Sequence, residues 1–135
     1  MKVISWNIRG SNGTQKIRLI KKRIKTDNPF LLMLQETKCN GTLLQERMAR
    51  TWKGCEVMAV DATGAAGGLA MVWHPSKVIL DQFITTPFSI SAQFTLIDSG
   101  LKGVISNVYG PASPREKPHF LDSLEYLASW ADQRH

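Results

Sequence analysis

Cysteine is scarce in this sequence, with only Cys39 and Cys55 among 135 residues. Two cysteines cannot build the disulfide framework of a small secreted domain, and neither has further Cys or His partners at the spacing of a zinc site. We therefore expect both thiols to be reduced and to take no part in chemistry, as in a cytosolic or nuclear protein.

Long apolar runs are also lacking. No segment approaches the ~20 consecutive apolar residues of a membrane span, and Met1 leads into Lys2 and a strand-like segment without the apolar core of a signal peptide. We expect an intracellular protein, nuclear or cytoplasmic, with no membrane partner. The sequence has no internal repeat or low-complexity linker, which favours a single domain.

Acidic residues are outnumbered by basic ones, 11 to 17, and the formal net charge is +6 at pH 7. On charge alone this excess favours either nucleic acid or an anionic membrane surface as a partner, and we weight nucleic acid more heavily. The content of hydrophobic residues, 43%, is that of an ordinary globular domain with one core.

The beginning of the chain alternates strand and helix patterns. Residues 2–6 predict a strand that enters the glycine-containing loop 10–13, and residues 14–25 predict an amphipathic helix with isoleucines on one face and basic residues on the others. Pro29 ends that helix, and the apolar run at residues 30–34 predicts a fully buried strand. This order is typical of a layered α/β fold.

A second helix is predicted at residues 42–52, and short strand-like segments follow, separated by glycine and proline turns. Their spacing predicts an antiparallel meander. The chain closes with an apolar helical stripe, which we expect to begin at Pro118 after a capping box formed by Ser113 and Glu116. The predicted strands cover residues 56–60, 69–73, 78–83, 89–96 and 101–108.

Two conspicuous features have plain structural explanations. The glycine-rich segment 64–68 lacks a Gly-Lys-Ser/Thr ending and precedes a strand instead of a helix, so it predicts a tight turn and not a phosphate-binding loop. The basic face of the helix at 14–25 favours a solvated surface over a DNA-binding role, although its lysines stay candidate phosphate contacts.

Glu36 is the first candidate for chemistry. It directly follows the predicted buried strand, and Asn7 follows the first strand, so both stand at strand ends, where open α/β folds place ligands. Carboxylate and amide oxygens are the ligands that a hard cation such as Mg²⁺ accepts. On spacing alone, a solvated surface carboxylate is the more common explanation for a single acidic residue at such a position.

Four motifs, in order along the chain, resemble the endonuclease/exonuclease/phosphatase family. They are an opening strand with its turn, a second strand with its glutamate, a glycine pair before a central strand, and a tyrosine-bearing segment. The first and last are most similar to endonuclease domains of LINE-type (non-LTR) retrotransposons. The four segments are Ser5-Trp6-Asn7-Ile8-Arg9-Gly10, Leu34-Gln35-Glu36-Thr37-Lys38, Gly67-Gly68-Leu69-Ala70-Met71-Val72-Trp73 and Asn107-Val108-Tyr109-Gly110-Pro111.

The resemblance implies a fold, an activity and a cofactor. The implied fold is α/β (α+β), the N-terminal half of a four-layer αββα sandwich with mixed and antiparallel sheets between flanking helices. The implied activity is nicking of a DNA phosphodiester with Mg²⁺ or Mn²⁺. By motif, Glu36 and Asn7 would bind the metal, Asn7 would also orient the site, and Tyr109 would contact the region of the scissile phosphate. The motif residues that would bind substrate are Arg9, Lys38 and Asn107.

The chain departs from the family pattern in its later motifs. It has no Asp-x-Asn segment, and none of its histidines, His74, His119 and His135, stands in a Ser-Asp-His context. Loss of members of a catalytic unit lowers the rate by a factor on the order of 10³ or more. We therefore predict one partial domain over residues 1–135, essentially inactive alone, with a missing C-terminal half or a reverse transcriptase domain as its partner.

Two alternatives stay open. The chain could be a non-catalytic basic remnant that binds nucleic acid through phosphate contacts, with steeply salt-dependent binding that Glu36→Gln leaves unchanged. It could also act within the same family on a phosphoinositide or another phosphomonoester. The segment from Gln35 to Lys38 and the basic charge favour DNA over a lipid.

Overall fold

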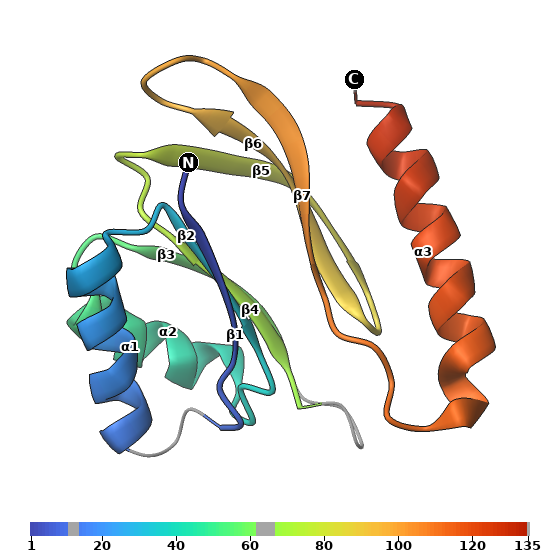
Figure 1. Ribbon diagram of the computed structural model, residues 1–135, viewed down its shortest axis with the longest axis horizontal. Helices are drawn as coiled ribbons and strands as arrows, with labels where there is room; N and C mark the ends of the chain where they lie inside the picture. Colours follow the sequence, from blue (N-terminus) through green and yellow to red (C-terminus); the bar gives the residue numbers. More distant parts are fainter. Residues whose placement is uncertain (11–13, 62–66, 135) are drawn as a thin grey trace.

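Two β-sheets with flanking helices make up residues 1–10, 14–61 and 67–134, the part of the chain that the computed structural model describes (Figure 1). Strands and helices alternate at the start, and strands dominate the middle. The elements are β1 (Val3–Asn7), α1 (Thr14–Asp27), β2 (Leu31–Gln35), α2 (Gly41–Thr51), β3 (Glu56–Val60), β4 (Leu69–Trp73), β5 (Val78–Thr86), β6 (Ser89–Leu96), β7 (Lys102–Val108), the 3-10 turn η1 (Pro114–Glu116) and α3 (Lys117–Asp132).

The first sheet, sheet A, has the strand order β1-β2-β4-β3. β1 and β2 are parallel, with Val3 opposite Leu31 and Asn7 opposite Gln35, and α1 forms the crossover between them. β4 pairs antiparallel with both β2 and β3. The central strands β2 and β4 are buried on both faces, which explains their nearly continuous apolar sequences.

The second sheet, sheet B, is an antiparallel meander in the order β5-β6-β7. β5 continues past its predicted end at residue 83 to Thr86, because irregular pairing between Asp81 and Ile84, with Gln82 at a φ of 51°, lets the strand bend and resume pairing. The prediction of one meander from residue 56 onward is wrong in one respect. β3 and β4 belong to sheet A, and β5 starts a separate sheet.

The two sheets pack face to face, and helices cover their outer sides (Figure 1). α1 and α2 lie against sheet A, and α3 lies beside sheet B, so the layers follow the order α, β, β, α. Sheet A is mixed and sheet B is antiparallel. The predicted αββα sandwich is confirmed.

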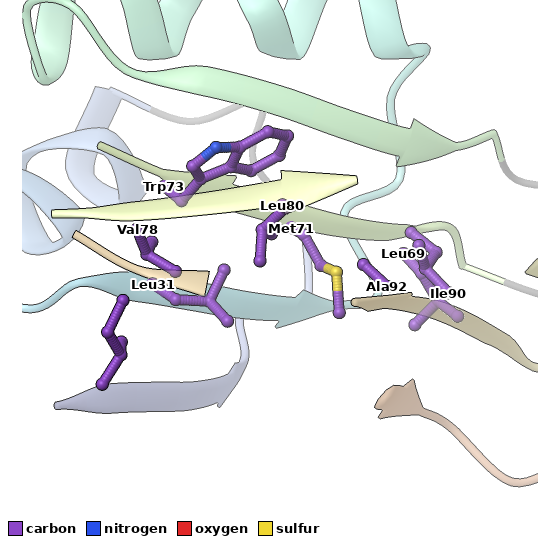
Figure 2. Close-up of a cluster of buried hydrophobic side chains, with 9 residues drawn as sticks. Leu31, Leu69, Met71, Trp73, Val78, Leu80, Ile90 and Ala92 are labelled. Atoms are coloured by element: carbon purple, nitrogen blue, oxygen red, sulfur yellow. The ribbon is translucent and has the colours of Figure 1, made fainter. Parts of the chain in front are cut away.

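A cluster of buried apolar side chains joins the two sheets. Figure 2 shows Leu31 of sheet A close to Val78 of sheet B, and Met71 of sheet A close to Ala92 of sheet B. All four side chains have no exposed surface. Since burial of a large apolar side chain stabilises a fold by about 1.5–3 kcal/mol, this cluster supplies much of the attraction between the sheets.

A second apolar cluster lies between sheet A and the helices. The predicted isoleucine stripe of α1 faces the sheet, with Ile20 fully buried, and α2 adds Leu44 and Met48. The Asn40 side chain caps α2 by accepting a hydrogen bond from the Leu43 N–H at 2.8 Å. The predicted amphipathic helices are thus confirmed, each with its apolar side toward sheet A.

The start of α3 differs from the predicted capping box. The Ser113 hydroxyl accepts a hydrogen bond from the Arg115 N–H at 3.3 Å, and the Glu116 side chain forms no capping bond. The reason is the tight η1 turn, in which the Glu116 N–H bonds to the Ser113 carbonyl instead. The helix then begins at Lys117, directly before the predicted start at Pro118.

Both cysteines are free of disulfides, as predicted. The Cys55 sulfur lies 3.5 Å from the Met48 carbonyl oxygen. Burial raises the pKa of the Cys55 thiol, which disfavours the reactive thiolate and fits a residue without chemistry.

Some sequence predictions fall outside the described residues. Residues 11–13 of the predicted glycine loop and 64–66 of the predicted glycine turn belong to these segments, whereas Gly10, Gly67 and Gly68 are described. Among the helices that the structure describes, none has the length and apolar character needed to cross a membrane.

The inter-sheet core can be tested with two isoleucines of sheet B. Ile90 has no exposed surface and Ile79 is 45% exposed. We expect Ile90→Ala to lower the free energy of unfolding by about 2–5 kcal/mol, because it leaves a cavity between the sheets. Ile79→Ala should change it by less than about 0.5 kcal/mol. Urea denaturation followed by circular dichroism measures both, and equal losses would contradict the packing described here.

Candidate functional site

The ends of several strands meet at one edge of sheet A. Asn7, the last residue of β1, lies opposite Gln35, the last residue of β2, because these strands are parallel. Gln35 also pairs with Leu69, the first residue of β4. Gly67 and Gly68 directly precede β4 in the chain. Glu36 directly follows β2. Asn7 and Glu36, separated by the whole of α1 in sequence, therefore stand at the same edge.

The backbone at Glu36 turns sharply out of the strand. Its φ is 54°, in the left-handed region that is sparsely populated by residues other than glycine. The Glu36 carbonyl accepts a hydrogen bond of 2.7 Å from the Gly10 N–H, which ties this turn to the turn that follows β1. Arg9 and Lys38 have φ values of 50° and 52°, so three residues of the two motifs adopt this conformation. Such strain persists where neighbouring contacts enforce it.

Gly67 holds Glu36 from the other side. A Cβ atom at residue 67 would lie 2.8 Å from Glu36 Cα and 3.0 Å from Glu36 Cγ, closer than real Cβ contacts. The Gly67 carbonyl accepts a 2.5 Å hydrogen bond from the Lys38 N–H, and the Gly68 carbonyl accepts one of 3.3 Å from the Thr37 N–H. Gly67 is therefore required by its close approach to the glutamate, whereas Gly68 has a φ of 89°, which favours glycine.

The Glu36 carboxylate is available for a ligand. Its residue is only partly buried, and the side chain forms no hydrogen bond or ion pair within the part of the chain that the structure describes. The Asn7 Oδ1 atom accepts a hydrogen bond of 3.2 Å from the Arg9 N–H, which leaves that oxygen a second lone pair. A carboxylate and an amide oxygen match the preference of Mg²⁺ or Mn²⁺ for oxygen ligands.

The donor set is small. Among the described residues there is no group of at least three His, Cys, Asp or Glu side chains that could hold a metal ion. Mg²⁺ commonly takes only one or two protein carboxylates and completes its coordination with water and substrate phosphate oxygens. The residues present fit such an open site and do not form a closed cage.

Asn107 connects the two sheets beneath this edge. Its Nδ2 donates to the carbonyls of Leu34 at 3.1 Å and Ala70 at 2.9 Å, and its Oδ1 accepts from Gln35 Nε2 at 2.8 Å. The side chain has no exposed surface. These bonds fix the position of β7 against β2 and β4. The predicted substrate contact of Asn107 stays a prediction.

Tyr109 follows Asn107 at the end of β7. Its N–H donates a 2.9 Å hydrogen bond to the Phe88 carbonyl, and its partly buried ring packs against the cluster between the sheets. Because the Asn107 amide is bonded to the carbonyls of Leu34 and Ala70, the chain leaves β7 near the edge at which Glu36 stands. The predicted phosphate contact of Tyr109 stays a prediction.

Arg9 and Lys38 are exposed, and both belong to the turns on either side of Glu36. The Lys38 side chain passes over Gly10, since a Cβ atom at that glycine would lie 3.8 Å from Lys38 Cδ. Two cations beside a carboxylate can attract an anionic substrate while the carboxylate holds a metal. Their predicted substrate contact is compatible with this placement and stays a prediction.

Asp61 is a carboxylate at the same edge that the sequence analysis missed. It follows β3, whose last residue, Val60, lies opposite Leu69. Its Oδ1 atom accepts a 2.7 Å hydrogen bond from the Gly41 N–H at the start of α2. The only sequence signal was its position directly after a predicted strand, as for Glu36, and its bond to the helix start gives it a structural partner.

Of the described histidines, His74 lies away from this edge. His74 follows β4 at the opposite end of sheet A, where Nδ1 accepts from the Ser76 N–H at 3.2 Å and Nε2 lies 3.1 Å from the Lys53 carbonyl oxygen. His119 is exposed on α3, and residue 135 is not described. His74 is therefore not positioned to activate water beside Glu36.

Comparison with known families gives one match over nearly the whole chain. A family model described as the endonuclease/exonuclease/phosphatase family matches residues 4–135. A comparison with curated proteins gave no match.

Solved structures of several proteins share this fold. The human Nocturnin catalytic domain has a TM-score of 0.68 and 17% identity over 94% of this chain and 58% of its own. A conserved protein of Enterococcus faecalis has a TM-score of 0.72 and 12% identity over 100% of this chain and 63% of its own. D. rerio TDP2, solved with a single-strand DNA product, has a TM-score of 0.66 and 17% identity over 93% of this chain and 54% of its own. This chain thus spans between half and two thirds of each structure.

The bridge made by Asn107 can be tested by stability. Asn107→Ala removes three buried hydrogen bonds, two to the carbonyls of Leu34 and Ala70 and one from the Gln35 amide, and we expect it to lower the free energy of unfolding by about 3 kcal/mol. Ser106→Ala, on the neighbouring residue, removes only the 2.6 Å bond to the Ser91 hydroxyl and should cost about 1 kcal/mol or less. Urea denaturation of both variants measures the difference, and a loss for Asn107→Ala no larger than for Ser106→Ala would refute the bridge.

Proposed function

Because this chain belongs to the endonuclease/exonuclease/phosphatase family, we propose that it carries the metal-binding part of a divalent-metal-dependent phosphodiesterase that nicks DNA. The amino-acid sequences of the first and last motifs support the finer assignment to LINE-type retrotransposon endonucleases. In this proposal Glu36 and Asn7 hold Mg²⁺ or Mn²⁺, and Tyr109, Arg9 and Lys38 contact the substrate.

One observation carries the proposal: a carboxylate with no hydrogen-bond or ion-pair partner among the described residues is held in a strained turn, at the sheet edge where Asn7 also stands. The Gly10 N–H on one side and the absent Cβ of Gly67 on the other hold the Glu36 backbone in place. A solvated surface carboxylate has no need of such support. A carboxylate that must bind a cation at a defined position does.

The metal accounts for the need for a fixed carboxylate. When bound, a divalent cation stabilises the negative charge that develops on phosphoryl oxygens during in-line attack. Glu36 would contribute a charged oxygen ligand and Asn7 a neutral one. Arg9 and Lys38, both exposed beside Glu36, would attract the phosphodiester and orient it toward the site.

We further propose that the base that activates water comes from polypeptide outside this chain. His74 lies at the opposite end of sheet A from Glu36, His119 is exposed on α3, and the similar solved domains are longer than this chain. The 135-residue chain is then one part of a domain, and its C-terminal half or a reverse transcriptase domain is its partner. Without that base the chain alone retains only metal polarisation and binding, which gives a negligible rate.

The basic charge favours DNA over a phosphomonoester as the substrate. The formal net charge is +6, and exposed cations lie beside the carboxylate. A polyanion with a phosphate at each nucleotide gains from every such cation, whereas a single phosphate gains from few. D. rerio TDP2, a protein of the same fold, was solved with a single-strand DNA product. A phosphoinositide or other phosphomonoester substrate, and a role in DNA binding without catalysis, are the alternatives.

Metal binding by the chain can be measured directly. We expect Mn²⁺ binding, followed by electron paramagnetic resonance of free Mn²⁺, to weaken by roughly tenfold or more in Glu36→Gln. Gly67→Ala should weaken it too, since the new Cβ displaces the Glu36 backbone. Glu46→Gln, an exposed residue of α2, is the matched control and should bind as the unchanged chain does. Equal Mn²⁺ affinities of Glu36→Gln and the unchanged chain would refute a metal site at Glu36.

Nicking of supercoiled plasmid in Mg²⁺ tests the activity. We expect no nicking by the chain alone and nicking by its fusion to the C-terminal part of a LINE-type endonuclease domain. Glu36→Gln in the fusion, or removal of Mg²⁺ with a chelator, should abolish that nicking because the phosphate loses its cation.

Parallel assays on p-nitrophenyl phosphate and on a phosphoinositide separate the substrate alternatives. A folded fusion that hydrolyses either compound and leaves the plasmid intact would refute the nuclease proposal. Nicking by the short chain that disappears in Glu36→Gln would show that its base lies within residues 1–135. Plasmid binding that falls steeply with salt and is unaffected by Glu36→Gln, without nicking by the fusion, would favour the binding role.

A further inference from the structure

The net charge of this chain is confined to the two helices that cover sheet A. Of the 17 basic and 11 acidic residues, α1 and α2 together carry eight and two, which leaves nine of each for the rest of the chain. The whole formal charge of +6 therefore belongs to one layer of the fold, on the outer side of sheet A (Figure 1). A surface that serves only solubility mixes both signs, so this concentration indicates a polyanionic partner.

Three cations of α1 form a stripe along its exposed side. Arg18, Lys21 and Lys25 are exposed, and their spacing of three and four residues places them on one face of the helix. The isoleucines of α1 occupy the side that packs on sheet A. The α1 residues that line a groove beside β1 are Leu19, Lys22, Arg23 and Thr26. The stripe belongs to neither side, so it does not depend on whether the β1 edge of sheet A is covered.

α2 adds two cations next to this stripe. The two helices contact each other over sheet A. The apolar side of α2 packs on the sheet, and another side, with Thr42 and Gln45, lines a groove beside β3. Arg47 and Arg50 belong to neither of these sides, and they stand three residues apart, so they lie on the side of α2 nearer α1. Arg50 is exposed and Arg47 is partly buried.

Few carboxylates neutralise this surface. The only acidic residue of α1 is Asp27, which lies 3.4 Å from Arg23, a cation outside the stripe. α2 has one acidic residue, Glu46. Within the part of the chain that the structure describes, none of the three cations of the stripe has an ion-pair partner. Their charges are therefore available to a ligand.

We propose that the surface formed by the stripe and the α2 arginines is a second nucleic-acid site, which binds phosphates of the backbone away from Glu36. α1 begins after β1, at the Glu36 edge, and ends before β2, at the opposite end of sheet A. At about 1.5 Å per residue, Lys25 lies roughly 10 Å further along the helix than Arg18. A nucleic acid bound here extends from the Glu36 edge over the helices. The choice of nucleic acid rests in part on the proposed DNA substrate.

The surface fits a nucleic-acid backbone better than a membrane or an acidic protein. A helix that binds a membrane surface inserts its apolar side among the lipids, whereas that side of α1 is packed on sheet A, with Ile20 buried. A protein interface has an apolar centre, whereas the stripe consists of cationic side chains alone. Neither helix contains an aromatic residue that could stack on bases, so we expect binding that is independent of base sequence.

The salt dependence of DNA binding tests the proposal on the full chain. The measurement is fluorescence anisotropy of a fluorescein-labelled DNA duplex at several salt concentrations, with a chelator present so that no metal contributes. The slope of log K against log salt reports how many phosphates the protein neutralises. We expect Lys21→Gln and Lys25→Gln each to weaken binding and to reduce this slope by about 1. Duplexes of different sequence should bind with the same affinity within about twofold.

Two controls separate the surface from the overall charge and from the metal site. Lys102→Gln removes one exposed cation from β7 of sheet B, the same change in net charge, and should leave the slope unchanged. Glu36→Gln should also leave it unchanged, because the metal is absent. Each replaced residue lies at the surface or is only partly buried, so we expect all four variants to fold.

Several results would overturn the proposal. Equal losses in Lys21→Gln and Lys102→Gln would mean that only the overall charge matters. A loss in Glu36→Gln as large as in Lys21→Gln would place the duplex at the Glu36 edge instead. Binding of polyglutamate or of phosphatidylserine vesicles that is stronger than binding of the duplex, and is weakened by Lys21→Gln, would assign the surface to an acidic protein or a membrane. Nicking by the fusion does not enter these readouts, so the two proposals can fail separately.

Discussion

The structure depends on the hydrogen bonds of one buried amide. Asn107 reaches from sheet B to carbonyls of β2 and β4 and to the Gln35 side chain in sheet A. Apolar packing between two sheets is non-directional and tolerates sliding, whereas these bonds are satisfied in one arrangement only. They fix the end of β7, which carries Tyr109, relative to the end of β2, which carries Glu36. The geometry of the site is therefore set in the core beneath it.

The elements of regular structure were largely predictable, because each has a local signal. The apolar runs of β2 and β4 and the isoleucine stripe of α1 indicate their own burial. Which strands share a sheet was not predictable, since short connections, residues 74–77 and 87–88, stand on both sides of β5. The role of Asn107 was missed for a similar reason: its partners, Leu34 and Ala70, are distant in sequence. The position of Glu36 after a strand was readable, but the support from Gly67 was not.

The left-handed turns at Arg9, Glu36 and Lys38 bear on how this protein can change over time. Glycine would adopt these φ values with less strain, so the backbone alone would select glycine at all three positions. The charged residues at these positions therefore lower the free energy of unfolding relative to a chain with glycine at the same φ values. Substitutions that raise the free energy of unfolding would replace these three residues first. Charged residues at these strained positions are what the proposed metal and substrate contacts would require.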